Sequence, residues 1–146
     1  MKRPTGFTLI ELMVTVAIIA ILTSLAITTY TQSIAKAQIS EALTVTDGLK
    51  ADVLNYYRQT GTCPVQGISG GLASSPASYS GKYVASVGVT TAAGSCVITA
   101  TMRSASVAPA LRGKQVTFTM TDSSTNSTRW LCSSDAAAVY VPQTCR

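Results

Sequence analysis

Histidine is absent from this chain, and acidic residues are few. Only six Asp and Glu side chains are present, and they are scattered without an evident pair. The sequence also contains no glycine-rich phosphate-binding loop. General acid–base catalysis usually relies on a histidine or a positioned carboxylate, and nucleotide chemistry relies on a phosphate cradle. These absences predict a protein that is not an enzyme and that holds no cofactor.

The cysteines also lack a metal-binding pattern. Four are present, Cys63, Cys96, Cys132 and Cys145, and no two form a C-x-x-C arrangement. Without histidine as an alternative ligand, a closed zinc site is disfavoured. All four follow the apolar N-terminal region, so they favour disulfides formed in an oxidising compartment. Four cysteines allow three pairings, which stay open at this point.

One long apolar run stands at the N-terminus. It extends from Phe7 to Ile27 after the basic leader MKRPTG, and its only charged residue is Glu11. A run of about 20 apolar residues can cross a bilayer as a helix, but a carboxylate at that depth is costly unless a cation pairs with it. Cleavage after Gly6 would create a cationic amine at Phe7, about one helical turn from Glu11. A secretory signal peptide cut near Ala26, or a plain membrane anchor, would leave Glu11 unexplained.

The run from Gly6 to Met13, GFTLIELM, resembles the leader junction and first helix of a bacterial type IV prepilin. The segments WLC at 130–132 and VPQTC at 141–145 resemble the cysteine-closed C-terminal loop of many type IVa pilins. In that family a prepilin peptidase cuts after the glycine and methylates the new terminus. The resemblance therefore implies cleavage after Gly6 and methylation of Phe7.

The same resemblance implies a disulfide and a filament. It pairs Cys132 with Cys145, which leaves Cys63 with Cys96. Residues 7–27 would form a transmembrane and filament-core helix, stored in the inner membrane with the head in the periplasm. The pilus assembly machinery would then polymerise identical subunits through their N-terminal helices into a surface filament, serving adhesion, twitching motility and DNA uptake. A pseudopilin of a type II secretion system and a minor DNA-receptor pilin are the alternatives.

Residues 28–61 become amphipathic without a turn signal, so the helix is predicted to continue to Gly61. One face carries a stripe predicted to be buried: Ala35, Ile39, Ala42, Thr46, Leu49, Val53 and Tyr56. The opposite face is predicted to be solvated: Lys36, Glu41, Asp47, Lys50, Asp52 and Arg58. Gly48 costs about 1 kcal/mol against alanine and is not expected to break the helix. Many type IVa pilins have a proline where this chain has Thr28, so no sharp kink is predicted there.

Residues 62–146 are predicted to form the head. Thr62 to Gly81 is rich in glycine, serine and proline, which indicates a loop. Four strand-like segments follow: Lys82–Val89, Cys96–Met102, Val116–Thr121 and Thr128–Ser133. The predicted fold is α+β, with a long N-terminal helix packed on a four-stranded antiparallel meander as in the type IV pilin roll. A free β-sandwich would leave the helical stripe exposed.

The head is basic, with Lys82, Arg103, Arg112, Lys114, Arg129 and Arg146 against two acidic residues. Such a charge could attract nucleic acid. The six cations are spread over the head without an evident stripe, however, and clustering is what makes a DNA footprint convincing. We expect these residues mainly to keep a filament surface soluble, with DNA as an alternative partner. Asn126 begins a short glycosylation-type pattern.

Overall fold

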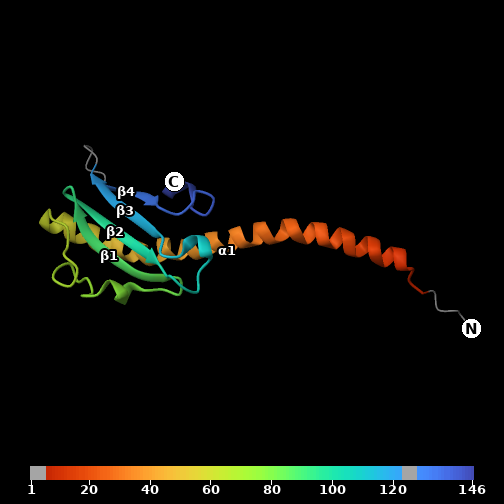
Figure 1. Cartoon of the computed structure of the whole chain (residues 1–146). Coiled ribbons are helices and arrows are strands. Elements are labelled where there is room, and N and C mark those ends of the chain that lie inside the picture. Colours follow the sequence, from red (N-terminus) through yellow and green to blue (C-terminus); the bar gives the residue numbers. More distant parts are fainter. Residues whose placement is uncertain (1–5, 123–127) are drawn as a thin grey trace, which may run out of the picture.

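The computed structural model describes residues 6–122 and 128–146 (Figure 1). One long helix, α1 (Leu9–Thr60), is followed by the strands β1 (Val84–Ala92), β2 (Ser95–Met102), β3 (Gln115–Asp122) and β4 (Thr128–Ser134). The strands pair antiparallel in the order β1-β2-β3-β4. Short 3₁₀ helices lie at Pro76–Tyr79 (η1), Pro109–Leu111 (η2) and Gln143–Cys145 (η3). The predicted α+β fold with a four-stranded meander is confirmed.

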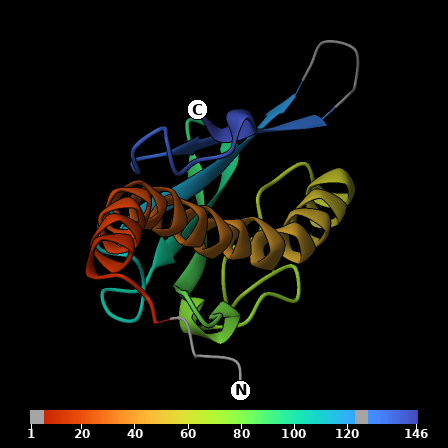
Figure 2. The same cartoon turned by 90° about the vertical axis from the view of Figure 1, so that its right-hand side faces the viewer.

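Helix α1 has a defined start and stop. Thr8 caps its N-terminus, and Gly61 ends it in the left-handed conformation with φ 70°. The Gly61 N–H donates to the Tyr57 carbonyl at 2.8 Å, which is a usual way to close the last turn. The helix is continuous through Gly48 and Thr28 over its 52 residues, as predicted, because neither residue removes a backbone hydrogen bond as proline would. Figure 2 shows it curving gently across the sheet.

The sheet covers the C-terminal half of α1. Six of the seven predicted stripe residues are buried, all except Tyr56. That side chain is half-buried, and it lines a surface hollow with Gln59 and Gly70. Strand β3 alternates as predicted, with its apolar Val116, Phe118 and Met120 buried. The sheet therefore removes most of the stripe from water and fixes the head on this half of the helix.

The prediction that the whole charged face of α1 is solvated is wrong for Glu41 and Lys50. Both side chains are partly buried. The Lys50 ammonium lies 3.7 Å from the centroid of the Phe118 ring and 2.9 Å from Asp47 Oδ1. Glu41 Oε2 accepts a hydrogen bond from the Tyr83 N–H at 3.0 Å. The sheet is wider than the helical stripe, so it reaches charged residues at the edges of that stripe.

Gln38 was not part of the predicted stripe, yet its side chain is 8% exposed. Its Oε1 accepts from the Ala108 N–H at 2.7 Å, which supplies the partner that a buried amide requires. This contact and the Glu41 contact attach the loops at one end of the sheet to α1. That end is the one nearest to the uncovered half of the helix (Figure 1).

Candidate assembly site

The N-terminal half of α1 projects from the head and has no protein cover (Figure 1). Its large apolar side chains are exposed, from Phe7 at 78% to Ile27 at 58%. Within the described ranges, α1 is the one helix that is long and apolar enough to span a membrane. Exposed apolar surface of this extent marks a membrane or protein interaction site. Lipid or neighbouring helices must therefore cover it.

Glu11 is held at the start of this apolar helix by Thr8. Its Oε2 accepts from the Thr8 hydroxyl at 2.6 Å and from the Thr8 N–H at 3.0 Å. The Glu11 N–H in turn donates to the Thr8 hydroxyl at 3.3 Å. This reciprocal arrangement is a capping box, which satisfies two of the free donors at a helix N-terminus. It turns the carboxylate toward the N-terminal end of the helix.

The role of Thr8 was not predicted, although the T-x-x-E spacing before an apolar run signals it. The predicted partner of Glu11 was a new amine at Phe7. In the uncleaved chain that nitrogen is an amide, and the carboxylate has Thr8 as its hydrogen-bond partner. Gly6 and Phe7 are exposed and precede the helix without regular secondary structure. The predicted cleavage junction thus lies beside the predicted charge site.

Two disulfides tie the head together. One joins Cys63, just after α1, to Cys96 on β2 with a Cα–Cα distance of 5.4 Å. The other joins Cys132 on β4 to Cys145 on η3 with a Cα–Cα distance of 4.4 Å. These are the pairings that the family resemblance implies. The second bond closes the segment 133–144 into a surface loop, in which Val139 is 41% exposed.

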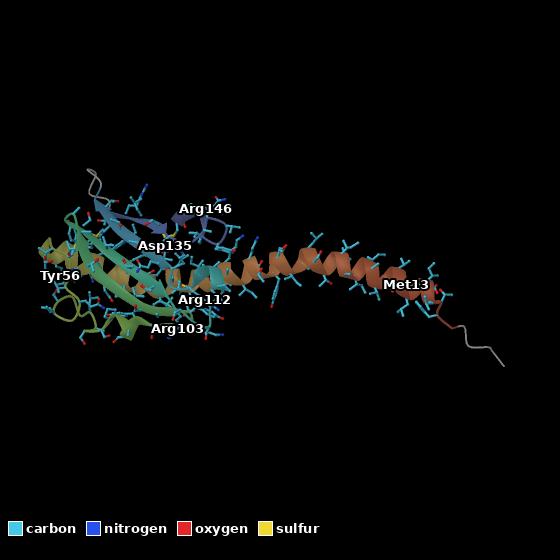
Figure 3. The ribbon with its side chains drawn as sticks, viewed as in Figure 1. Met13, Tyr56, Arg103, Arg112, Asp135 and Arg146 are labelled. Atoms are coloured by element: carbon cyan, nitrogen blue, oxygen red, sulfur yellow. A yellow bond between two sulfur atoms is a disulfide. The ribbon has the colours of Figure 1, made fainter. Side chains whose placement is uncertain are left out.

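The basic residues of the head gather at one end of the fold, although they show no evident stripe in the sequence. The registers Val84↔Met102, Thr101↔Gln115 and Val116↔Ser134 bring together one end of all four strands. Four of the six head cations lie in or beside the connections at that end: Lys82, Arg103, Arg112 and Lys114. A fifth, Arg146, lines a hollow together with Lys36 of α1. Figure 3 shows Arg103, Arg112 and Arg146 toward the side from which α1 projects. The glycosylation-type pattern at Asn126 begins outside the described residues.

Comparison with known proteins identifies the family. The family model described as pilin, a bacterial filament, matches residues 35–146, and the prokaryotic N-terminal methylation motif matches residues 1–27. The chain is 43% identical over 141 residues to the fimbrial protein EcpC of Eikenella corrodens, covering 97% of this chain and 90% of that protein. It is 39% identical over 127 residues to a type IV major pilin protein PilE1 of Neisseria gonorrhoeae, covering 87% and 74% of the two chains.

A fimbrial protein of Neisseria meningitidis serogroup A is 40% identical over 127 residues, covering 87% of this chain and 71% of that protein. These matches span both the apolar helix and the head, and they agree with the observed α+β architecture. The methylation motif and the pilin family together imply processing by a prepilin peptidase and polymerisation into pili. The chain therefore belongs to the bacterial pilin family, with type IV pilins among its relatives, and it is a structural subunit of a pilus and not an enzyme.

Proposed function

We propose that the precursor is stored in the inner membrane as a single-pass protein with its head in the periplasm. The observation that carries this proposal is the uncovered apolar half of α1, which begins at the methylation motif. Prepilin peptidase cuts after Gly6 and methylates Phe7. Residues 7–27 then leave lipid for a bundle of identical helices in the filament core, while residues 62–146 form the outer surface.

The charge at Glu11 directs this exchange. Apolar helices that move from lipid into a bundle change one apolar environment for another, so packing and polar contacts must supply the specificity. The Phe7 amine exists only after cleavage, and it stays cationic when methylated. We propose that Glu11 of one subunit pairs with the Phe7 amine of its neighbour. Such a head-to-tail contact does not close on itself, and it therefore generates a fibre through the pilus assembly machinery.

The finished filament is proposed to serve adhesion, twitching motility and DNA uptake. The loop at 133–144 is the proposed adhesion surface, because the Cys132–Cys145 disulfide holds it at the surface of the head. Exposed side chains there include Val139. This loop also favours a pilin over the alternative of a type II secretion pseudopilin, since pseudopilins generally lack it. The relatives named as major pilins favour the major subunit over a minor DNA-receptor pilin.

Purified sheared filaments test the proposal. We expect the most abundant filament protein to have the intact mass of a chain that begins at Phe7 with one added methyl group. A strain lacking the prepilin peptidase provides the control, and it should retain the full-length chain in the inner membrane. Recovery of the chain only in short periplasmic structures would instead support the pseudopilin alternative.

A further inference from the structure

Basic residues gather at the end of the head from which α1 projects, and we call this group the basic collar. We define this collar as Lys36, Lys82, Arg103, Arg112, Lys114 and Arg146. Two hydrogen bonds attach loops that contain collar residues to nearby turns of α1. The Ala108 N–H donates to Gln38 Oε1 at 2.7 Å, and the Tyr83 N–H donates to Glu41 Oε2 at 3.0 Å. The collar thus combines residues from four parts of the chain: α1, the segment before β1, the β2–β3 connection and the segment after η3.

Acidic groups do not cancel this charge. The described side-chain carboxylates in the same region belong to Glu41 and Asp135. Glu41 is engaged by the Tyr83 N–H, and Asp135 accepts from the Gln115 N–H at 2.6 Å and lies 3.9 Å from the Lys114 ammonium. Six basic side chains accompany these two side-chain carboxylates, so the collar keeps a net positive charge. Lys36 and Arg112 are both exposed.

The collar also contains a hollow that is lined by two of its cations. A hollow of about 290 Å³ is lined by Lys36, Arg146 and the segment from Tyr140 to Gln143. The Arg146 Nε donates to the Val141 carbonyl at 3.3 Å, which holds that side chain against the segment. Lys36, which also lines the hollow, lies on α1. A phosphate group between them would meet cations from two sides.

Lys36, the collar residue on α1, lies close to the level at which lipid phosphates would be found. The apolar run ends at Ile27, and the next charged residue is Lys36, about 13 Å further along the helix. The polar headgroup layer accounts for roughly 5–8 Å on each side of a bilayer. Transmembrane helices also tilt by about 20° on average. The remaining gap is therefore shorter than the Debye length of about 8 Å at physiological salt.

We propose that the collar docks the head of the stored subunit onto the anionic phospholipid headgroups of the membrane that anchors it. This inference rests on the proposed storage of the precursor as a membrane helix. Docking would hold the head near the bilayer surface and limit the orientations of α1 before assembly. Each Lys or Arg close to an anionic bilayer contributes about a fivefold factor in binding. The docked population should therefore depend strongly on lipid charge and on salt.

The full chain, reconstituted in vesicles with a dansyl-labelled headgroup lipid, provides the test. Trp130 is the only tryptophan, and it lies on β4 about 13 Å from Ser134 at the collar end. Energy transfer from Trp130 to dansyl reports the height of the head. We expect more transfer when phosphatidylglycerol replaces part of the phosphatidylcholine, and we expect high salt to reverse the gain.

Two matched variants identify the cations responsible. Lys36→Gln with Arg112→Gln removes two collar charges and should lower the docking constant about 25-fold. The control variant, Arg58→Gln with Arg129→Gln, removes two charges that lie outside the collar. Arg58 is near the C-terminal end of α1 and Arg129 is near the start of β4, so docking should be unchanged. All four side chains are exposed, and circular dichroism checks that both proteins fold. Equal transfer in neutral and anionic bilayers, or equal loss in both variants, would overturn the proposal.

Two further readouts separate this proposal from others. Resistance to alkaline extraction reports insertion of the helix, so a chain that fails to insert refutes membrane storage itself and the docking that depends on it. A chain that inserts but shows no lipid dependence refutes docking alone. A third outcome would identify the collar as a nucleic-acid surface instead. The protein would then retard duplex DNA in a gel, the Lys36 and Arg112 changes would weaken that retardation, and lipid charge would not alter the energy transfer.

Discussion

Glu41 and Gly81 are predicted to be energetically coupled. A Cβ added at Gly81 would overlap Glu41 Oε1, and the same carboxylate accepts from the Tyr83 N–H at 3.0 Å. Because the overlapping atom is at the end of a flexible side chain, alanine at Gly81 should push the carboxylate away and break that hydrogen bond. Gly81 itself has no positive φ, so its backbone accepts alanine without strain.

The magnitudes follow from this geometry. A hydrogen bond to a charged group contributes about 1.5–3 kcal/mol, and the partial exposure of Glu41 favours the lower value. Glu41→Ala should therefore lower the free energy of unfolding by about 1.5 kcal/mol. Gly81→Ala loses the same bond and regains about 0.5 kcal/mol by restricting the unfolded chain. The free energy of unfolding of the double variant should therefore be lower than that of the unchanged protein by only about 1 kcal/mol. Additive effects would lower it by about 2.5 kcal/mol.

Guanidinium unfolding of the full chain in detergent, followed by Trp130 fluorescence, measures these differences. The matched control is Gly48→Ala, which replaces an exposed helical glycine with no atom within 4 Å of the added Cβ. It should stabilise the protein by up to about 1 kcal/mol, and it should add to the effect of Glu41→Ala. A double variant of Glu41 and Gly81 that is as unstable as the sum of the single variants would refute the overlap argument.

Three further predictions concern processing, assembly and the disulfides. Replacing Gly6 with a bulky residue should leave the chain uncleaved in the membrane, and intact mass checks this; a processed Phe7 terminus in that variant would contradict the assigned junction. Glu11→Ala and Glu11→Val should insert in the membrane and fail to assemble, as measured by extraction and by filament yield, so normal yield from both would exclude the charge pair. Removing the Cys63–Cys96 disulfide, whose cysteines are 33 residues apart, should lower the free energy of unfolding by about 3.7 kcal/mol through chain entropy. Removing the Cys132–Cys145 disulfide, with a separation of 13 residues, should lower it by about 3 kcal/mol. Denaturant unfolding of the two cysteine-to-serine pairs tests the order, and peptide mapping without reduction that finds Cys63 joined to Cys132 would refute the pairing.

Features that depend on local patterns could be predicted from the sequence. The apolar run, the leader junction and the position of Glu11 are contiguous in the chain, and they indicate the family before any tertiary contact is known. The helical stripe from Ala35 to Val53 and the alternation in β3 follow from the periods of 3.6 and 2. Continuity through Thr28 was also predictable, since it depends on local hydrogen bonding.

Which distant residues meet depends on tertiary contacts, and these could not be predicted from local patterns. The partner of Glu41 depends on how far the sheet extends over the helix, and a single-sequence pattern does not contain that width. The basic collar depends on strand register, because antiparallel pairing returns every second connection to the same end of the sheet. Lys82, Arg112 and Arg146 are far apart in the sequence, and so they appear scattered there. The fold brings their charges to the end from which α1 projects, because β1 begins, β2 ends and β3 begins at that end.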